Sequence, residues 1–141
     1  MHNERFDQAV SKILERDSAF PRQAYELMPA ALNYTLRRLQ AGQPGAEVHG
    51  HVNGRQLAEG FRDFMLEEYG PFAADILAKY NIRSTADIGR LVYNLISVGM
   101  FGKTENDREA DFRNLYDFRD AFELPFQPIN PLGKPPPGMQ M

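Results

Sequence analysis

His49 and His51 form a residue pair with the spacing of metal ligands. They flank Gly50 in a loop rich in glycine and proline, and paired imidazoles can bind zinc or nickel. A stable site needs three or four ligands. Glu47 is the only nearby carboxylate, and the chain contains no cysteine. We therefore expect a solvated loop that holds no metal.

Patterns typical of catalysis or of nucleotide binding do not occur in the sequence. It contains neither a Gly-x-Ser-x-Gly nucleophile motif nor a dinucleotide fingerprint. Gly102, Lys103 and Thr104 match the end of a phosphate-binding loop, but that motif needs a glycine where Ser97 stands. We expect no catalytic residue, no cofactor and no enzymatic activity.

Several polar residues in the second half of the chain have the chemistry to contact a partner or nucleic acid. Arg90 and Asn94 belong to an expected outward stripe of one helix, and such side chains read guanine and adenine. However, residues 70–116 carry six acidic and six basic residues, whereas DNA binding needs several cations on one face. Any affinity for nucleic acid is therefore expected to be weak. The candidate contacts are Arg83, Arg90, Asn94, Lys103 and Arg108.

Length and composition indicate a soluble single domain. A chain of 141 residues and 16.1 kDa is long enough to bury a core. Its formal charge of −3 provides no basic field for nucleic acid. The absence of cysteine suits a reducing compartment. There is no apolar run long enough for a membrane span and no signal-peptide core at the start. We expect a cytoplasmic protein.

Apolar spacing, capping residues and helix breakers predict five helices. They are expected at about residues 3–16, 21–40, 54–69, 71–80 and 85–98. Asn3, Asn53 and Ser84 are predicted N-caps. Pro29 predicts a kink or a fresh start within the second helix. Phe72 is expected to face inward.

The order of elements in residues 72–113 resembles a winged helix-turn-helix. A helix, a turn with Ile82 inward, a capped second helix and Gly99 are followed by two expected short strands, at residues 100–104 and 109–113. In that motif the second helix enters the major groove. The predicted fold class is mostly α with a small β-hairpin, an N-terminal helical pair plus a winged helix-turn-helix-like unit.

The predicted globular domain spans residues 1–126. It divides into a helical pair at 1–42, a loop at 43–52 and the winged-helix-like unit at 53–126. Residues 127–141 are expected to form a proline-rich extended tail, because such segments favour polyproline II, which docks into aromatic-lined grooves. The tail is therefore a candidate docking segment, with the contacts Lys134, Pro135, Pro136, Pro137 and Met139.

The pattern between Phe6 and Phe126 resembles an uncharacterised family of small bacterial proteins. The most specific shared stretches are Gly102-Lys103-Thr104-Glu105, Asp111-Phe112, Tyr116-Asp117-Phe118 and Pro125-Phe126. The resemblance implies a bacterial, intracellular single-domain protein, and it brings no known activity, cofactor or catalytic residue.

These observations favour a non-enzymatic protein-interaction module. The alternative function is a winged-helix protein of weak or context-dependent affinity for nucleic acid. A protein partner is expected, a homo-oligomer is possible, and no membrane association is expected.

Overall fold

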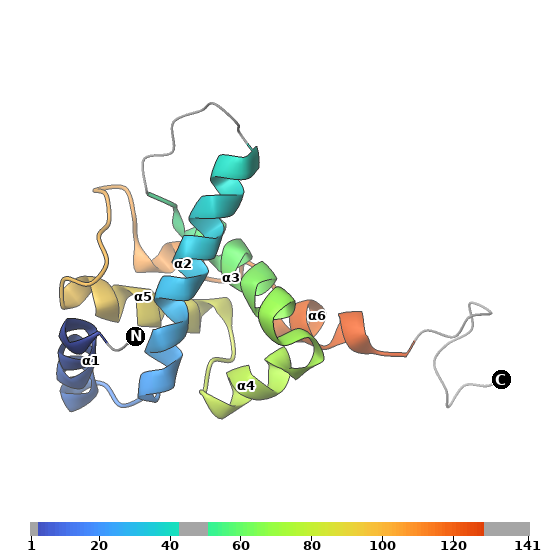
Figure 1. Ribbon diagram of the computed structural model, residues 1–141, viewed down its shortest axis with the longest axis horizontal. Helices are drawn as coiled ribbons and strands as arrows, with labels where there is room; N and C mark the ends of the chain where they lie inside the picture. The colour runs from blue at the N-terminus through green and yellow to red at the C-terminus, as the bar shows by residue number, and fades with distance from the viewer. Residues whose placement is uncertain (1–2, 43–50, 129–141) are drawn as a thin grey trace.

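Every regular element of the described chain is helical (Figure 1). The computed structural model describes residues 3–42 and 51–128. The elements in chain order are α1 (Glu4–Arg16), α2 (Arg22–Gly42), α3 (Gly54–Tyr69), the 3-10 helix η1 (Gly70–Phe72), α4 (Ala73–Lys79), α5 (Thr85–Ser97), the 3-10 helix η2 (Glu109–Phe112), α6 (Phe118–Phe122) and the 3-10 helix η3 (Leu124–Phe126). No helix within these residues has the length and apolarity to cross a membrane.

Side-chain caps set the starts of α1, α3 and α5, and this confirms three predictions from the sequence. Asn3 and Ser84 each accept a hydrogen bond from the backbone N–H three residues further on. Asn53 and Gln56 cap α3 reciprocally, each side chain accepting from the other's backbone N–H, at 2.8 and 2.9 Å. These caps satisfy donors that a helix start leaves unpaired.

Helices α2 and α3 pack against each other, and Figure 1 shows α3 beginning beside the middle of α2 and running away from it towards α4. α2 continues through Pro29 as one helix, so no new helix begins there. The two backbones approach where Gly60 of α3 faces Thr35 of α2, whose hydroxyl donates to the Ala31 carbonyl at 2.7 Å. Glycine is needed at this crossing because the Thr35 side chain occupies the space of a Cβ.

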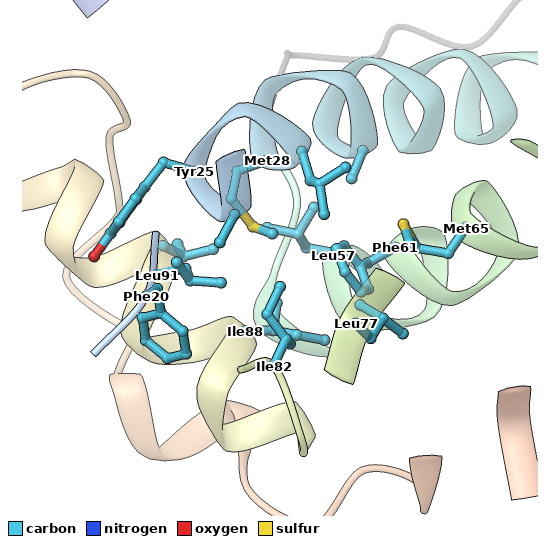
Figure 2. Packing of buried hydrophobic residues seen from close by; sticks show 14 of the residues in the cluster. Phe20, Tyr25, Met28, Leu57, Phe61, Met65, Leu77, Ile82, Ile88 and Leu91 are labelled. Carbon is cyan, nitrogen blue, oxygen red and sulfur yellow. The ribbon is translucent and has the colours of Figure 1, made fainter. Parts of the chain in front are cut away.

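The core is formed by buried apolar side chains that reach it from α1 to α5 and from the turns between them (Figure 2). Ile88, Leu91 and Leu95 on α5 are fully buried, as the sequence predicted. Phe112 of η2 closes one side of this core and lies directly against Gly89 of α5. η2 is therefore anchored on α5 through this phenylalanine.

The predicted β-hairpin is wrong, since residues 100–113 contain no strand. The Asp107 carboxylate accepts from the backbone N–H and the hydroxyl of Thr104, at 2.8 and 3.1 Å. The Asp111 carboxylate accepts from the backbone N–H of Arg108 at 2.9 Å. These turns take the donors that a strand ladder would use, and η2 then carries Phe112 into the core. Without the hairpin, the winged unit that we expected lacks its wing.

The expected inward position of Phe72 is also wrong, because its side chain is 68% exposed. Gly70 has a φ of +51°, a conformation that glycine adopts without strain. The chain turns there into η1 before α4 begins. The helix therefore starts two residues later than predicted, and Phe72 stays outside its buried face.

Candidate functional site

A pocket of about 290 Å³ opens between α2, α3, α5 and the loop of residues 100–108, which is drawn in orange beside α5 in Figure 1. We call it the loop pocket. Its walls are mostly apolar, whereas several residues around it are charged. The apolar walls include Leu57, Val92, Ile96, Met100 and Phe112.

A contact between His51 and Asp107 joins the two chain segments that border the loop pocket. His51 Nε2 lies 3.1 Å from the Asp107 carboxylate. Burial alone would raise the pKa of Asp107, but the hydrogen bonds from Thr104, together with the charges of His51 and Lys103, hold it below its ordinary value. Asp107 is thus an anion that the protein's own donors already occupy.

Two cations that line the loop pocket have no carboxylate partner among the described residues. The Arg108 guanidinium makes no ion pair there, although its backbone N–H is bonded to Asp111. Lys103 Nζ contacts only the backbone carbonyl of Thr104, at 3.4 Å. Both side chains are exposed and are therefore available to an incoming anion.

The Tyr93 hydroxyl is a buried group without a hydrogen-bond partner in the described structure, and Tyr93 lines the loop pocket. Its ring makes an edge contact with Phe112, with the centroids 6.5 Å apart. Burial and the nearby negative charges of Asp107, Asp111 and Glu109 raise the pKa of Tyr93, which keeps the hydroxyl protonated. A buried hydroxyl left unpaired costs about 1–3 kcal/mol. A bound ligand with an acceptor atom would remove that cost.

The N-terminus of α3 adds positive potential to the same pocket. Asn53 and Gly54 line it, and the first turn of α3 has no acidic residue to offset the helix dipole. A Cβ on Gly54 would lie 3.2 Å from both Asp111 and Phe112, so η2 packs tightly over this helix start. The pocket therefore combines apolar walls, two exposed cations, two carboxylates that already accept hydrogen bonds, and an unpaired hydroxyl.

No protein-family model, curated protein or solved structure matches this chain. The resemblance to a bacterial family stays a prediction.

Of the five contact residues predicted from the sequence, the structure brings Lys103 and Arg108 together at the loop pocket. Arg83 lies apart from them, in the turn before α5, where its guanidinium contacts Asn81 at 3.4 Å. Arg90 and Asn94 are both bonded to Asp17, at the end of α1.

Asn94 was expected on an outer face, and that expectation is wrong because the residue is only 9% exposed. Its amide donates to Asp17 and to the Tyr25 hydroxyl, both at 3.0 Å. The Arg90 guanidinium donates two hydrogen bonds to the Asp17 carboxylate, from Nε and from Nη2, each at 2.9 Å. Asp17 therefore joins α1 to α5 and covers the part of α5 that we had expected to be free.

Two further predictions from the sequence involve the histidine pair, which was expected to hold no metal, and the C-terminal tail as a docking segment. Among the described residues, no group of three His, Asp or Glu side chains could hold a metal ion. His49 lies outside the described residues, and His51 is paired with Asp107. The predicted tail contacts, Lys134, Pro135, Pro136, Pro137 and Met139, also lie outside the described residues.

Sequence reasoning missed Tyr93 and the pairing of His51 with Asp107. Tyr93 lies in the most apolar predicted helix, where an aromatic residue is expected to belong to the hydrophobic core. The one available signal was its hydroxyl, since a buried tyrosine usually needs a partner for that group. The pairing of His51 with Asp107 joins positions 56 residues apart in sequence, and no local pattern reports such a contact.

We expect the protein to lose stability in acid through Asp17. Burial alone would raise the pKa of Asp17, but hydrogen bonds from Asn94, the Ala19 N–H and Arg90 outweigh this and lower it. The native state therefore binds fewer protons than the unfolded state. The stabilisation is present above the unfolded pKa and is lost as pH falls through the folded pKa. Urea unfolding at pH 6 and at pH 3 measures the loss. D17N should show a smaller difference between the two pH values, and an unchanged difference would contradict the assignment.

Proposed function

We propose that this chain is a non-enzymatic interaction module that binds a partner protein through the loop pocket. The observation that carries the proposal is the presence of two unpaired cations, Lys103 and Arg108, beside a hollow with apolar walls. Protein interfaces are commonly built around apolar side chains that fill pockets, with a polar rim that sets orientation. We also propose a cytoplasmic location, because a chain without cysteine suits a reducing compartment.

The alternative, binding to nucleic acid, receives less support from the geometry. The described residues contain no hairpin to act as a wing. Arg90 and Asn94 of α5, the two residues that we expected to read bases, are bonded to Asp17. Only Lys103 and Arg108 remain together, and two cations are few for a phosphate-binding face.

Affinity purification from the native host tests the proposal. Tagged protein is compared with the double variant K103E/R108E and with the control R119E, which changes one exposed charge on α6, outside the pocket lining. Each variant is first checked for native circular dichroism. We expect one partner protein to be recovered with the wild type and R119E, and at least tenfold less with the double variant.

Nuclease treatment of the lysate separates the two functions. Recovery that persists after nuclease, and that depends on Lys103 and Arg108, supports a protein-binding pocket. Recovery that disappears with nuclease would favour nucleic acid. Recovery that is equal for all three proteins would show that the loop pocket is not the binding surface.

A further inference from the structure

We propose that the loop pocket receives the C-terminal residue of the partner chain, its apolar side chain between the walls and its terminal carboxylate beside Lys103 and Arg108. This inference rests on the proposed function and names the chemistry that the site recognises. Three features of the described structure support it: the charges at the pocket, the size of the hollow and the groove beside it.

The charges favour an anion. Asp107 and Asp111 also line the pocket, but Asp107 already accepts contacts from Thr104 and His51, and Asp111 accepts from the Arg108 backbone N–H. Lys103 and Arg108 have no carboxylate within ion-pair distance among the described residues, although the charge of Lys103 acts on Asp107. A guanidinium binds a carboxylate through paired hydrogen bonds, which fix its orientation. The N-terminus of α3, which has no acidic residue in its own first turn, acts in the same direction, and Asp111 packs against Gly54 at this helix start.

The Tyr93 hydroxyl supplies a third recognition element. It is protonated, buried and without a partner, so it can donate to an oxygen of the ligand's last residue. The hydroxyl has almost no exposed surface, so a ligand in the pocket reaches it only when neighbouring side chains move aside. A ligand that fills the hollow with apolar atoms and also carries a nearby acceptor atom suits both the apolar walls and the Tyr93 hydroxyl.

The size of the hollow favours a single side chain. Its volume of about 290 Å³ lies just below the lower end of the range for pockets that enclose drug-sized ligands, about 300–1,000 Å³. Apolar residues from several elements surround it, including Leu57, Ile96 and Phe112. An aliphatic or aromatic side chain therefore fits the walls, and a charged one would lose hydration there.

The neighbouring groove accommodates the residues that precede the C-terminus. It has a volume of about 570 Å³, lies along α1 and α2, and shares Met100 and Phe101 with the loop pocket. Asp7 and Glu26 line it, and Asp7 also contacts Arg22. A basic residue shortly before the C-terminus suits these carboxylates. A free small acid would use the loop pocket but not the groove, and this favours a peptide chain as the source of the carboxylate.

Binding of short labelled peptides tests the inference directly. The probes are fluorescein-Gly-Ser-Arg-Gly-Xaa peptides with Xaa leucine, phenylalanine, methionine or aspartate, each made as the free acid and as the C-terminal amide. Fluorescence anisotropy with the full chain measures affinity. We expect the best apolar free acid to bind at least tenfold tighter than its amide and than the peptide that ends in aspartate. Equal binding of acid and amide would overturn carboxylate recognition.

Variants locate the binding and identify its source. K103Q/R108Q should reduce the preference for acid over amide to about twofold or less, whereas R119Q should leave it unchanged. Y93F should weaken binding of the free acid by at least about tenfold, the effect of losing one hydrogen bond to a charged group. N-acetyl-leucine should bind at least tenfold more weakly than the peptide that ends in leucine. If it binds equally well, the pocket is a small-acid site and the C-terminal assignment is wrong.

The outcome is distinguishable from failure of the proposed function. If no peptide binds while partner recovery still depends on Lys103 and Arg108, the inference is wrong and the interaction module stands. If partner recovery is independent of the loop pocket, the proposed function itself is wrong.

Discussion

G60A is expected to destabilise the protein by about 3 kcal/mol or more, at or above the upper end of the cost of overpacking a core. A Cβ at this position would lie 1.8 Å from Thr35 Oγ1, 2.8 Å from Thr35 Cβ and 3.0 Å from Thr35 Cγ2. Rotation of the threonine side chain cannot relieve all three contacts, since its Cβ is fixed to the backbone of α2. The gain of about 1 kcal/mol that alanine brings to a helix interior is therefore outweighed.

Urea unfolding of G60A measures this loss, and G42A is the matched control. Gly42 is also helical, but a Cβ there meets nothing within 4 Å. G42A should leave the free energy of unfolding within about 1 kcal/mol of the wild type. The double variant T35A/G60A should recover only part of the loss, because the alanine Cβ at position 35 still lies too close. Equal stability of G60A and G42A would show that α2 and α3 are further apart than described.

The long helices could be predicted from the sequence because their signals are local. Asn53 and Gln56 form a cap within one turn, and Ser84 caps the most apolar segment of the chain. Such pairs act over three residues, so a linear pattern contains them completely. The buried stripe of α5 follows from helical spacing in the same way.

The sequence alone did not show that the hairpin is absent. Strands and turns closed by side-chain hydrogen bonds use the same backbone N–H donors, so one sequence pattern suits both. Residues 100–113 alternate enough to suggest strands, but Asp107 and Asp111 each accept a backbone N–H from the residue three positions earlier. Gly89 then allows Phe112 to pack against α5. The contact between Gly89 and Phe112 joins residues 23 positions apart, and a pattern of local periodicity does not report it.

The candidate site depended even more on distant contacts. Lys103 and Arg108 were identified from their chemistry, but the sequence grouped them with Arg90 and Asn94, which the structure assigns to Asp17. A carboxylate more than 70 residues away decides whether those polar groups are free. The loop pocket could not be predicted from the sequence for the same reason. Its walls come from separate elements, and only the packing of the core brings these elements together.

L91A is expected to lower the free energy of unfolding by about 2–5 kcal/mol, and L95A by a similar amount. Both side chains are fully buried on α5, and Figure 2 shows Leu91 within the cluster that includes Phe20, Met28 and Ile88. Removing the side chain beyond Cβ forfeits its transfer free energy and leaves a cavity, which helices packed from several directions cannot close fully.

L124A provides the matched comparison, since Leu124 on η3 is 41% exposed and the same atoms are removed there. It should cost less than about 1 kcal/mol, because much of its apolar surface already contacts water. The three variants are compared by urea unfolding under one set of conditions, with the slope m checked for constancy. A loss below about 1 kcal/mol for both L91A and L95A would mean that the buried face of α5 is assigned incorrectly. Since Val92, Tyr93 and Ile96 on the adjacent face line the loop pocket, the position of that pocket would then be wrong as well.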